Sequence, residues 1–138
     1  METSTTEKNK AIVRNIFEQA INKKRMELLK DLIDDNYVGP RGGKGYESFL
    51  MPIKPLLTAF PDIEWKIQDI IGEGDKVMLR WQWQGTHKAA FNEFAATGKT
   101  VTNDGMGLFE LKNGKVVSTI ILTDRLGFMQ QIDAVPVK

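Results

Sequence analysis

Residues 77–84 read Val-Met-Leu-Arg-Trp-Gln-Trp-Gln, and every second side chain from Val77 to Trp83 is apolar. A period of two is typical of a β-strand with one buried face. A similar but less regular run covers residues 65–71, and the turn-forming sequence Gly-Glu-Gly-Asp at 72–75 separates the two. The pair is therefore predicted to be two antiparallel strands.

Two more strands are predicted on the C-terminal side, at residues 100–111 and 115–123. They are joined through Asn113-Gly114, a dipeptide that readily adopts the positive φ angles of a tight hairpin. The N-terminal side is helical instead, because apolar residues recur at helical spacing over residues 12–21 and again over 26–33. Helices that precede antiparallel strands indicate an α+β domain, with the helices covering one face of a curved antiparallel or mixed sheet.

The region between the helices and the strands has two parts. Residues 39–45 form a glycine-rich connection that we interpret as a loop at the mouth of a pocket. Residues 46–60 have a helical pattern, although Pro52 and Pro55 each remove a backbone donor and should kink or split the helix.

Composition limits the function. The chain has 138 residues, which fits one domain over 1–138, and 19 basic against 18 acidic residues leave a formal charge of +1. This charge supplies no broad positive field, so we expect a small neutral ligand and no nucleic acid. With no cysteine and a single histidine, no metal-ligand spacing is found. No apolar run suits a membrane span or a secretion signal, so we expect no membrane partner and a cytoplasmic location.

Four motifs resemble those of one known family. They are Ala-Phe-Pro-Asp at 59–62, Gly-Thr-His at 85–87, Thr-Gly-Lys at 97–99 and Asp-Arg-Leu-Gly-Phe-Met-Gln-Gln-Ile at 124–132. In this order and spacing, the chain resembles the SnoaL-like polyketide cyclase group of the NTF2-like superfamily, which are small cone-shaped domains. The resemblance implies a pocket inside the cone, no cofactor, a homodimer formed through the outer sheet face, and a hydrophobic small molecule as partner.

The resemblance also implies that Asp124 is a general acid or base, because an aspartate near the end of the last strand has this role in SnoaL-like cyclases. A carboxyl group surrounded by apolar side chains is poorly solvated, which raises its pKa toward neutral pH. The alternative is that Asp124 caps the turn that follows it. His87 shares strand parity with Trp81 and Trp83 and is the second candidate catalytic residue, unless it only hydrogen-bonds to backbone at a strand end.

Asn103 shares parity with Phe109 and could donate a hydrogen bond to a ligand carbonyl. The other candidate substrate-binding residues are aromatic or aliphatic: Trp81, Trp83, Phe91, Phe94, Phe109 and Leu122. Phe91 and Phe94 fall where the family has a loop over the mouth of the cone, so they could form a lid or contact a second subunit. Arg80 and Asp104 are predicted to pair across strands on the outer face; reversed parity would instead give an inward pair like that of limonene-epoxide hydrolases.

Two functions remain open. The first is a cofactor-independent cyclase or isomerase that acts on a hydrophobic carbonyl compound. The second is a non-catalytic domain that binds a small molecule in the same pocket. Residues 119–121 read Thr-Ile-Ile where many relatives carry a His-Trp-Asp type cluster, and this difference favours binding over proton transfer.

Overall fold

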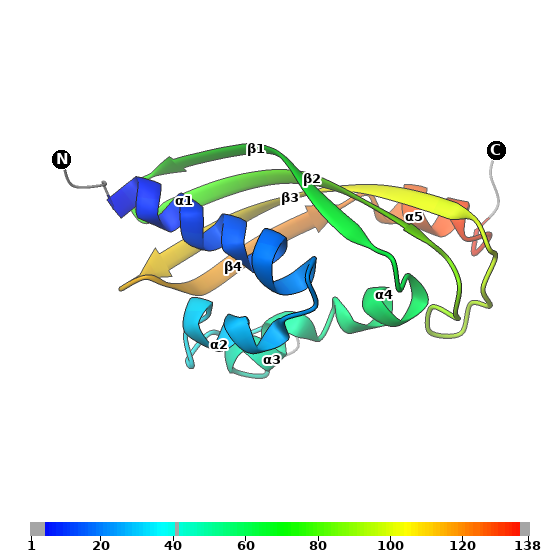
Figure 1. The fold of residues 1–138 in the computed structure, drawn as a ribbon, viewed down its shortest axis with the longest axis horizontal. Helices are drawn as coiled ribbons and strands as arrows, with labels where there is room; N and C mark the ends of the chain where they lie inside the picture. The colour runs from blue at the N-terminus through cyan, green and yellow to red at the C-terminus, as the bar shows by residue number, and fades with distance from the viewer. Residues whose placement is uncertain (1–4, 41, 136–138) are drawn as a thin grey trace.

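The computed structural model describes residues 5–40 and 42–135. The four predicted strands form one antiparallel sheet in chain order: β1 (Glu64–Glu73), β2 (Lys76–Thr86), β3 (Thr100–Lys112) and β4 (Lys115–Thr123). The sheet is long and curved, as Figure 1 shows. The α+β prediction is confirmed, and the sheet is antiparallel throughout.

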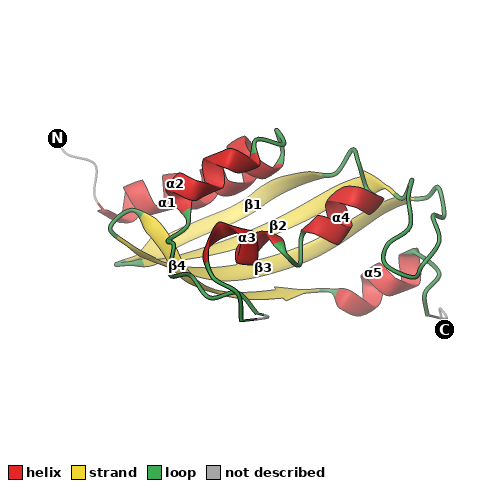
Figure 2. Cartoon of the chain, turned by 90° about the horizontal axis from the view of Figure 1, so that it is seen from below, coloured by secondary structure: helices red, strands yellow, loops and turns green. Residues whose placement is uncertain are grey.

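The helices of the N-terminal half all lie on one face of this sheet (Figures 1 and 2). Their bounds are α1 (Thr5–Asn15), which continues as the π-helix η1 (Ile16–Ile21), the 3₁₀-helix η2 (Met26–Leu28), α2 (Leu29–Leu32), α3 (Gly45–Leu50) and α4 (Lys54–Ala59). The predicted helix at 46–60 is indeed split, because Pro52 lies in the turn between α3 and α4 and Pro55 occupies the first turn of α4. A last helix, α5 (Arg125–Gln131), follows β4.

The core lies between the inner sheet face and these helices. Phe17 of η1 is its centre: the Phe17 ring stacks on Trp81, with ring centroids 5.4 Å apart, and meets Phe109 edge to face at 6.1 Å. Asn22, just after η1, holds the strand β1 in place. Its side-chain amide donates to the carbonyl of Trp65 and accepts from the Trp65 N–H, both at 2.8 Å.

β4 contains a bulge that decides which of its residues face inward. Leu111 pairs with Val116, but Glu110 pairs with Ser118, so Val117 is an extra residue. An extra residue moves every later side chain to the opposite face. As a result, Val116 is buried, but beyond the bulge it is Thr119, not Ser118, that turns toward the helices.

Arg80 and Asp104, which were predicted to pair, both lie on the outer face of the sheet. Both side chains are exposed, so the inward arrangement of limonene-epoxide hydrolases does not occur. The predicted pairing is wrong, however. Arg80 binds Asp69 of β1 at 2.6 Å, while Asp104 accepts a hydrogen bond from Gln82 at 3.0 Å.

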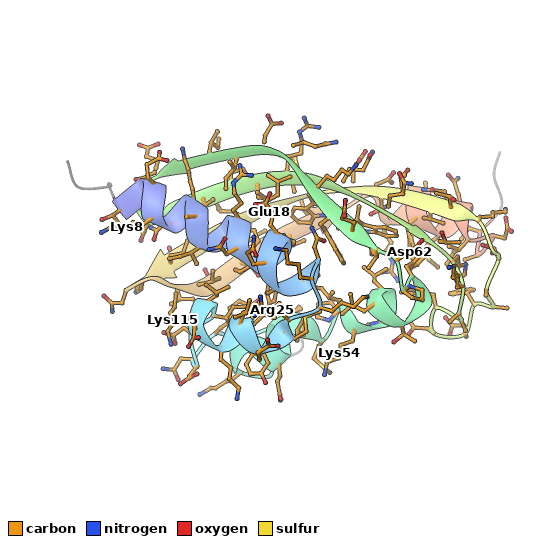
Figure 3. All side chains as sticks on the ribbon, viewed as in Figure 1. Lys8, Glu18, Arg25, Lys54, Asp62 and Lys115 are labelled. Carbon is orange, nitrogen blue, oxygen red and sulfur yellow. The ribbon has the colours of Figure 1, made fainter. Side chains whose placement is uncertain are left out.

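Charged side chains project from the helical layer, as Figure 3 shows for Lys8 on α1 and Lys54 on α4. Asp62, labelled in the same view, precedes β1, and its carboxylate accepts hydrogen bonds from the backbone N–H and the hydroxyl of Thr86, both at 2.7 Å. These bonds lower the pKa of Asp62. Within 5–40 and 42–135, no helix is long and apolar enough to cross a bilayer.

Candidate functional site

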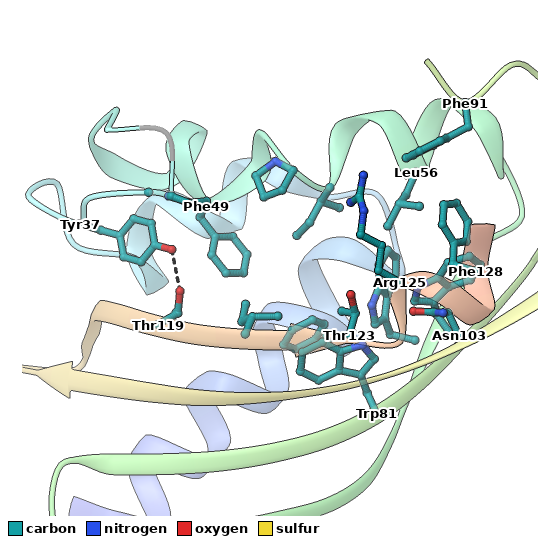
Figure 4. Close-up of a pocket in the computed structure, with 18 of the residues that line it drawn as sticks. Tyr37, Phe49, Leu56, Trp81, Phe91, Asn103, Thr119, Thr123, Arg125 and Phe128 are labelled. Atoms are coloured by element: carbon teal, nitrogen blue, oxygen red, sulfur yellow. Dashed lines mark hydrogen bonds between the residues drawn. The ribbon is translucent and has the colours of Figure 1, made fainter. Parts of the chain in front are cut away.

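A cavity of about 420 Å³ lies between the inner sheet face and the helices α3 and α4. Its walls are mostly apolar and include all three tryptophans of the chain (Figure 4). The lining residues are Phe17, Tyr37, Val38, Gly39, Pro40, Phe49, Pro52, Ile53, Leu56, Trp65, Trp81, Trp83, Phe91, Asn103, Thr119, Ile121, Thr123, Arg125 and Phe128. Volume and lining are both typical of sites for small organic molecules.

One end of the cavity holds a hydroxyl pair. The Tyr37 phenol and the Thr119 hydroxyl lie 2.8 Å apart (Figure 4). Burial raises the pKa of Tyr37, and the hydrogen bond with Thr119 opposes the shift only in part. Tyr37 therefore stays protonated at neutral pH, where its hydroxyl can donate to a carbonyl oxygen.

The other end holds Asn103, Thr123 and Arg125. Asn103 is buried, and its side-chain N–H donates to the carbonyl of Asp124 at 2.8 Å. This bond fixes the amide at the point where β4 passes into α5. One amide hydrogen and the amide oxygen have no other hydrogen bond within the described chain, which leaves them for a ligand.

Asp124 does not project into the cavity, contrary to the expectation that apolar side chains surround its carboxyl group. Its side chain is exposed and accepts a hydrogen bond from the backbone N–H of Gly127 at 2.9 Å, which caps α5. A Cβ at position 127 would collide with this carboxylate, so the glycine leaves room for the cap. The structure thus shows the alternative that the sequence left open.

His87 does face inward, as its parity predicted, but it lies beyond the cavity. Its ring is fully buried and stacks on Phe60, with centroids 5.1 Å apart. Nδ1 accepts from the backbone N–H of Thr97 at 3.2 Å, and Nε2 has no hydrogen-bond partner among the described residues. Desolvation lowers the pKa of His87. His87 therefore anchors the segment that follows β2 and does not reach the cavity.

The SnoaL-like polyketide cyclase model matches residues 11–132. The chain belongs to the SnoaL-like polyketide cyclase family. No curated protein matches the sequence. Among solved structures, the chain is similar to a protein assigned as a polyketide cyclase from Acidithiobacillus ferrooxidans, with 26% identity, a TM-score of 0.81, and 97% of this chain and 100% of the other covered.

Two further solved structures share the fold. One is assigned as a SnoaL-like polyketide cyclase from Jannaschia sp. CCS1, at 21% identity and a TM-score of 0.83, and the match covers 99% of each chain. The other is TsrD from Streptomyces laurentii, at 19% identity and a TM-score of 0.84, with 97% of this chain and 100% of TsrD covered. The predicted family and the cone fold are thus confirmed.

Some of the other predicted pocket residues of this SnoaL-like domain line the cavity, and others do not. Trp81, Trp83 and Phe91 line the cavity, and Phe91 meets Phe128 edge to face at 5.0 Å. Three predicted pocket residues do not line it. Phe109 is fully buried behind Phe17; Phe94 pairs with the backbone of Phe91; and Leu122 is 73% exposed, because the bulge in β4 turns it outward.

The sequence reasoning missed Tyr37, Thr119, Thr123 and Arg125. Thr119 entered the sequence analysis only as a departure from the family pattern. No local signal could have placed the two threonines, because their orientation depends on the bulge at Val117. Arg125 was visible in the sequence beside Asp124, and its place at the junction of β4 and α5 was the available signal.

We found no cluster that suits a metal ion in the described ranges 5–40 and 42–135, since no three His, Asp or Glu side chains come together there. Tyr37 and Arg125 are the ionisable side chains that line the cavity. The site as it stands can hold an apolar molecule and hydrogen-bond to it at both ends.

Proposed function

We propose that this SnoaL-like domain binds a small hydrophobic carbonyl compound in the cavity under the sheet, without a cofactor. One observation supports the proposal above the others: three tryptophans wall a cavity of about 420 Å³ that has a hydroxyl pair at one end and an amide at the other. Such a site buries an apolar ring system and orients it through few polar contacts.

The polar ends define the expected contacts. The Tyr37 hydroxyl donates to a ligand oxygen while it keeps Thr119 as its neighbour, and the free N–H of Asn103 donates to a second oxygen. A ligand oxygen that is buried without such a donor would lose its hydrogen bonds to water. A polyketide-derived ring precursor, which carries oxygens on an apolar frame, meets both requirements.

Tryptophan fluorescence tests this function directly, because all three indoles line the cavity. Titration with aromatic β-keto esters should change the emission and saturate. Tyr37→Phe should weaken the affinity about fivefold to tenfold, the value of one hydrogen bond. Lys8→Ala, at an exposed position of α1 outside the cavity lining, is the matched control and should bind as the wild type does. Absence of any saturable change over a broad panel would contradict the proposal.

A second candidate function is cofactor-independent cyclisation or isomerisation of the same compound. Family membership favours it, and so does the position of Asp124 between Thr123 and Arg125, which both line the cavity. In this mechanism the Asp124 carboxylate leaves the Gly127 N–H and removes a proton from the carbon next to the carbonyl. Asn103 then stabilises the enolate oxygen.

Asp124→Asn separates capping from chemistry, because asparagine caps a helix about as well as aspartate but cannot take up a proton. Catalysis by Asp124 predicts that Asp124→Asn retains the thermal stability of the wild type and loses turnover. Asp124→Ala is the control for the cap and should lose about 1 kcal/mol of stability. Equal turnover by Asp124→Asn and the wild type would remove Asp124 from the mechanism.

We also propose a homodimer formed through the outer sheet face. Four large apolar side chains are exposed on strands β1, β3 and β4: Ile71 at 65%, Met106 at 47%, Ile120 at 66% and Leu122 at 73%. Met106 pairs with Leu122 across adjacent strands, so part of this set is contiguous. Light scattering should give twice the monomer mass, and Leu122→Lys should give the monomer; a monomeric wild type would refute the proposal.

A further inference from the structure

Arg125 differs in kind from the rest of the cavity lining. Within the described chain it is the one side chain of the lining that carries a charge at neutral pH, and no carboxylate lines the cavity beside it. It begins α5, directly after Asp124. Figure 4 shows its side chain rising from the end of β4 across the cavity toward Leu56 of α4.

Arg125 also has no partner of opposite charge. The ion pairs within 5–40 and 42–135 involve other residues, such as Arg14 with Glu18, Arg80 with Asp69 and Lys99 with Asp133. The acid next to it in sequence, Asp124, is turned to the Gly127 N–H. Arg125 is exposed and has no hydrogen bond within the described chain, so its five N–H donors are available to a molecule in the cavity.

The surroundings of Arg125 select among anions. A guanidinium presents two parallel N–H groups that match the two oxygens of a carboxylate. Thr123, whose hydroxyl has no hydrogen bond within the described chain, lines the same end of the cavity and can donate to one of those oxygens. Trp81 lies close to this end in Figure 4, and Trp83 also lines the cavity. A ligand that fits both parts is apolar over most of its length and carries one carboxylate.

We infer that the ligand of this cavity is an amphipathic carboxylic acid, held with its carboxylate on Arg125 and Thr123 and its apolar body against the tryptophans. The inference rests on the proposed function and specifies it: the carbonyl compound is an acid and not a neutral ester. Recognition of the acid requires no bond to form or break, so it applies equally to a binding domain and to an enzyme.

Matched probes test the inference by calorimetry: 2-naphthoic acid, and its methyl ester, which has the same ring system but no charge. The wild type should bind the acid about tenfold more tightly than the ester, as expected for a charge-assisted hydrogen-bonded pair. Arg125→Gln should lose this preference: its affinity for the acid should fall about tenfold, and its affinity for the ester should not change. Arg125→Lys keeps the positive charge but lacks the two parallel N–H groups of the guanidinium. Its affinity for the acid should lie between those of the wild type and Arg125→Gln. High salt should lower the affinity for the acid and leave the affinity for the ester unchanged.

Arg80→Gln is the control variant, because Arg80 lies on the outer face and binds Asp69 there. It should bind both probes as the wild type does. Equal affinity of the wild type for acid and ester would overturn the inference while leaving the proposed function intact. Equal loss of both probes in Arg125→Gln would overturn it as well, since that result assigns Arg125 a role in the shape of the cavity. Failure of every variant, wild type included, to bind either probe would count against the proposed function and the inference together.

Discussion

Gly105 lies on the inner face of β3, directly across from Trp81 of β2. The indole covers this glycine so closely that an added Cβ would lie 2.5 Å from two ring carbons and 2.7 Å from the indole nitrogen. Carbon atoms in contact prefer separations of about 3.5 to 4.0 Å. Gly105→Ala therefore requires the indole, or the strand beneath it, to move by roughly 1 Å.

The size of the effect follows from two opposing terms. Overpacking a core position typically costs about 1 to 3 kcal/mol. Replacing glycine by alanine within a strand by itself stabilises the fold by about 0.5 to 1 kcal/mol, because the unfolded chain loses less conformational entropy on folding. We expect a net loss of about 1 to 2 kcal/mol in the free energy of unfolding. The indole can move in only a few directions, since Phe17 stacks on it at 5.4 Å. Movement away from β3 reduces the cavity, so ligand affinity should fall too.

Urea denaturation and the fluorescence titration measure the two effects on one protein sample. Gly72→Ala is the matched control, because Gly72 also lies in a strand but faces the side chains of Thr6 and Lys10 on α1, which can give way. It should change stability by less than about 0.5 kcal/mol. Wild-type stability and wild-type affinity in Gly105→Ala would refute the close packing of the indole on β3.

Three further predictions concern the packing around the cavity. Asn22→Ala removes both hydrogen bonds to the Trp65 backbone and should cost about 2 to 3 kcal/mol in urea denaturation, whereas a loss below about 0.5 kcal/mol would show that the pair contributes little. Burial lowers the pKa of His87 below its ordinary 6.5, so the unfolded chain takes up the proton first; stability should be complete above about pH 6.5 and fall as the pH drops through the lower folded-state pKa. The non-titrating His87→Gln should flatten that part of the pH profile of the urea midpoint, and an unchanged slope would contradict the assignment. A double-mutant cycle of Tyr37→Phe with Thr119→Val should give a coupling energy of about 0.5 to 1.5 kcal/mol, and a coupling of zero would mean that the 2.8 Å contact is not a stabilising hydrogen bond.

Strand alternation predicted orientation well only where the ladder is regular. In β2 the pairing with β3 runs without a break, and Trp81 and Trp83 face inward as predicted. In β4, Leu122 faces outward and does not line the cavity, because one extra residue at Val117 reverses the faces beyond it. A bulge depends on how two strands meet, and a periodicity within one strand does not contain that information.

The candidate catalytic residues show a related limit. Residue type and position in the motif pointed to Asp124 as a candidate acid, and the same position suits a helix cap. The choice depends on one χ rotation toward Gly127, which the folded backbone makes favourable by presenting a free N–H. For His87 the direction was predictable by parity, but its distance from the cavity was not, since the Phe60 ring and the Thr97 backbone fill the space around it.

The sequence by itself determined the α+β class, the order of helices and strands, the hairpins and the family, because these depend on local periodicity, turn residues and motif spacing. Only the tertiary structure decided which side chains share the cavity. Tyr37 and Thr119 are 82 positions apart in the chain, and Arg125 of α5 lines the same cavity as Phe49 of α3. Contacts at such separations are set by register, bulges and packing, which arise when the whole chain folds.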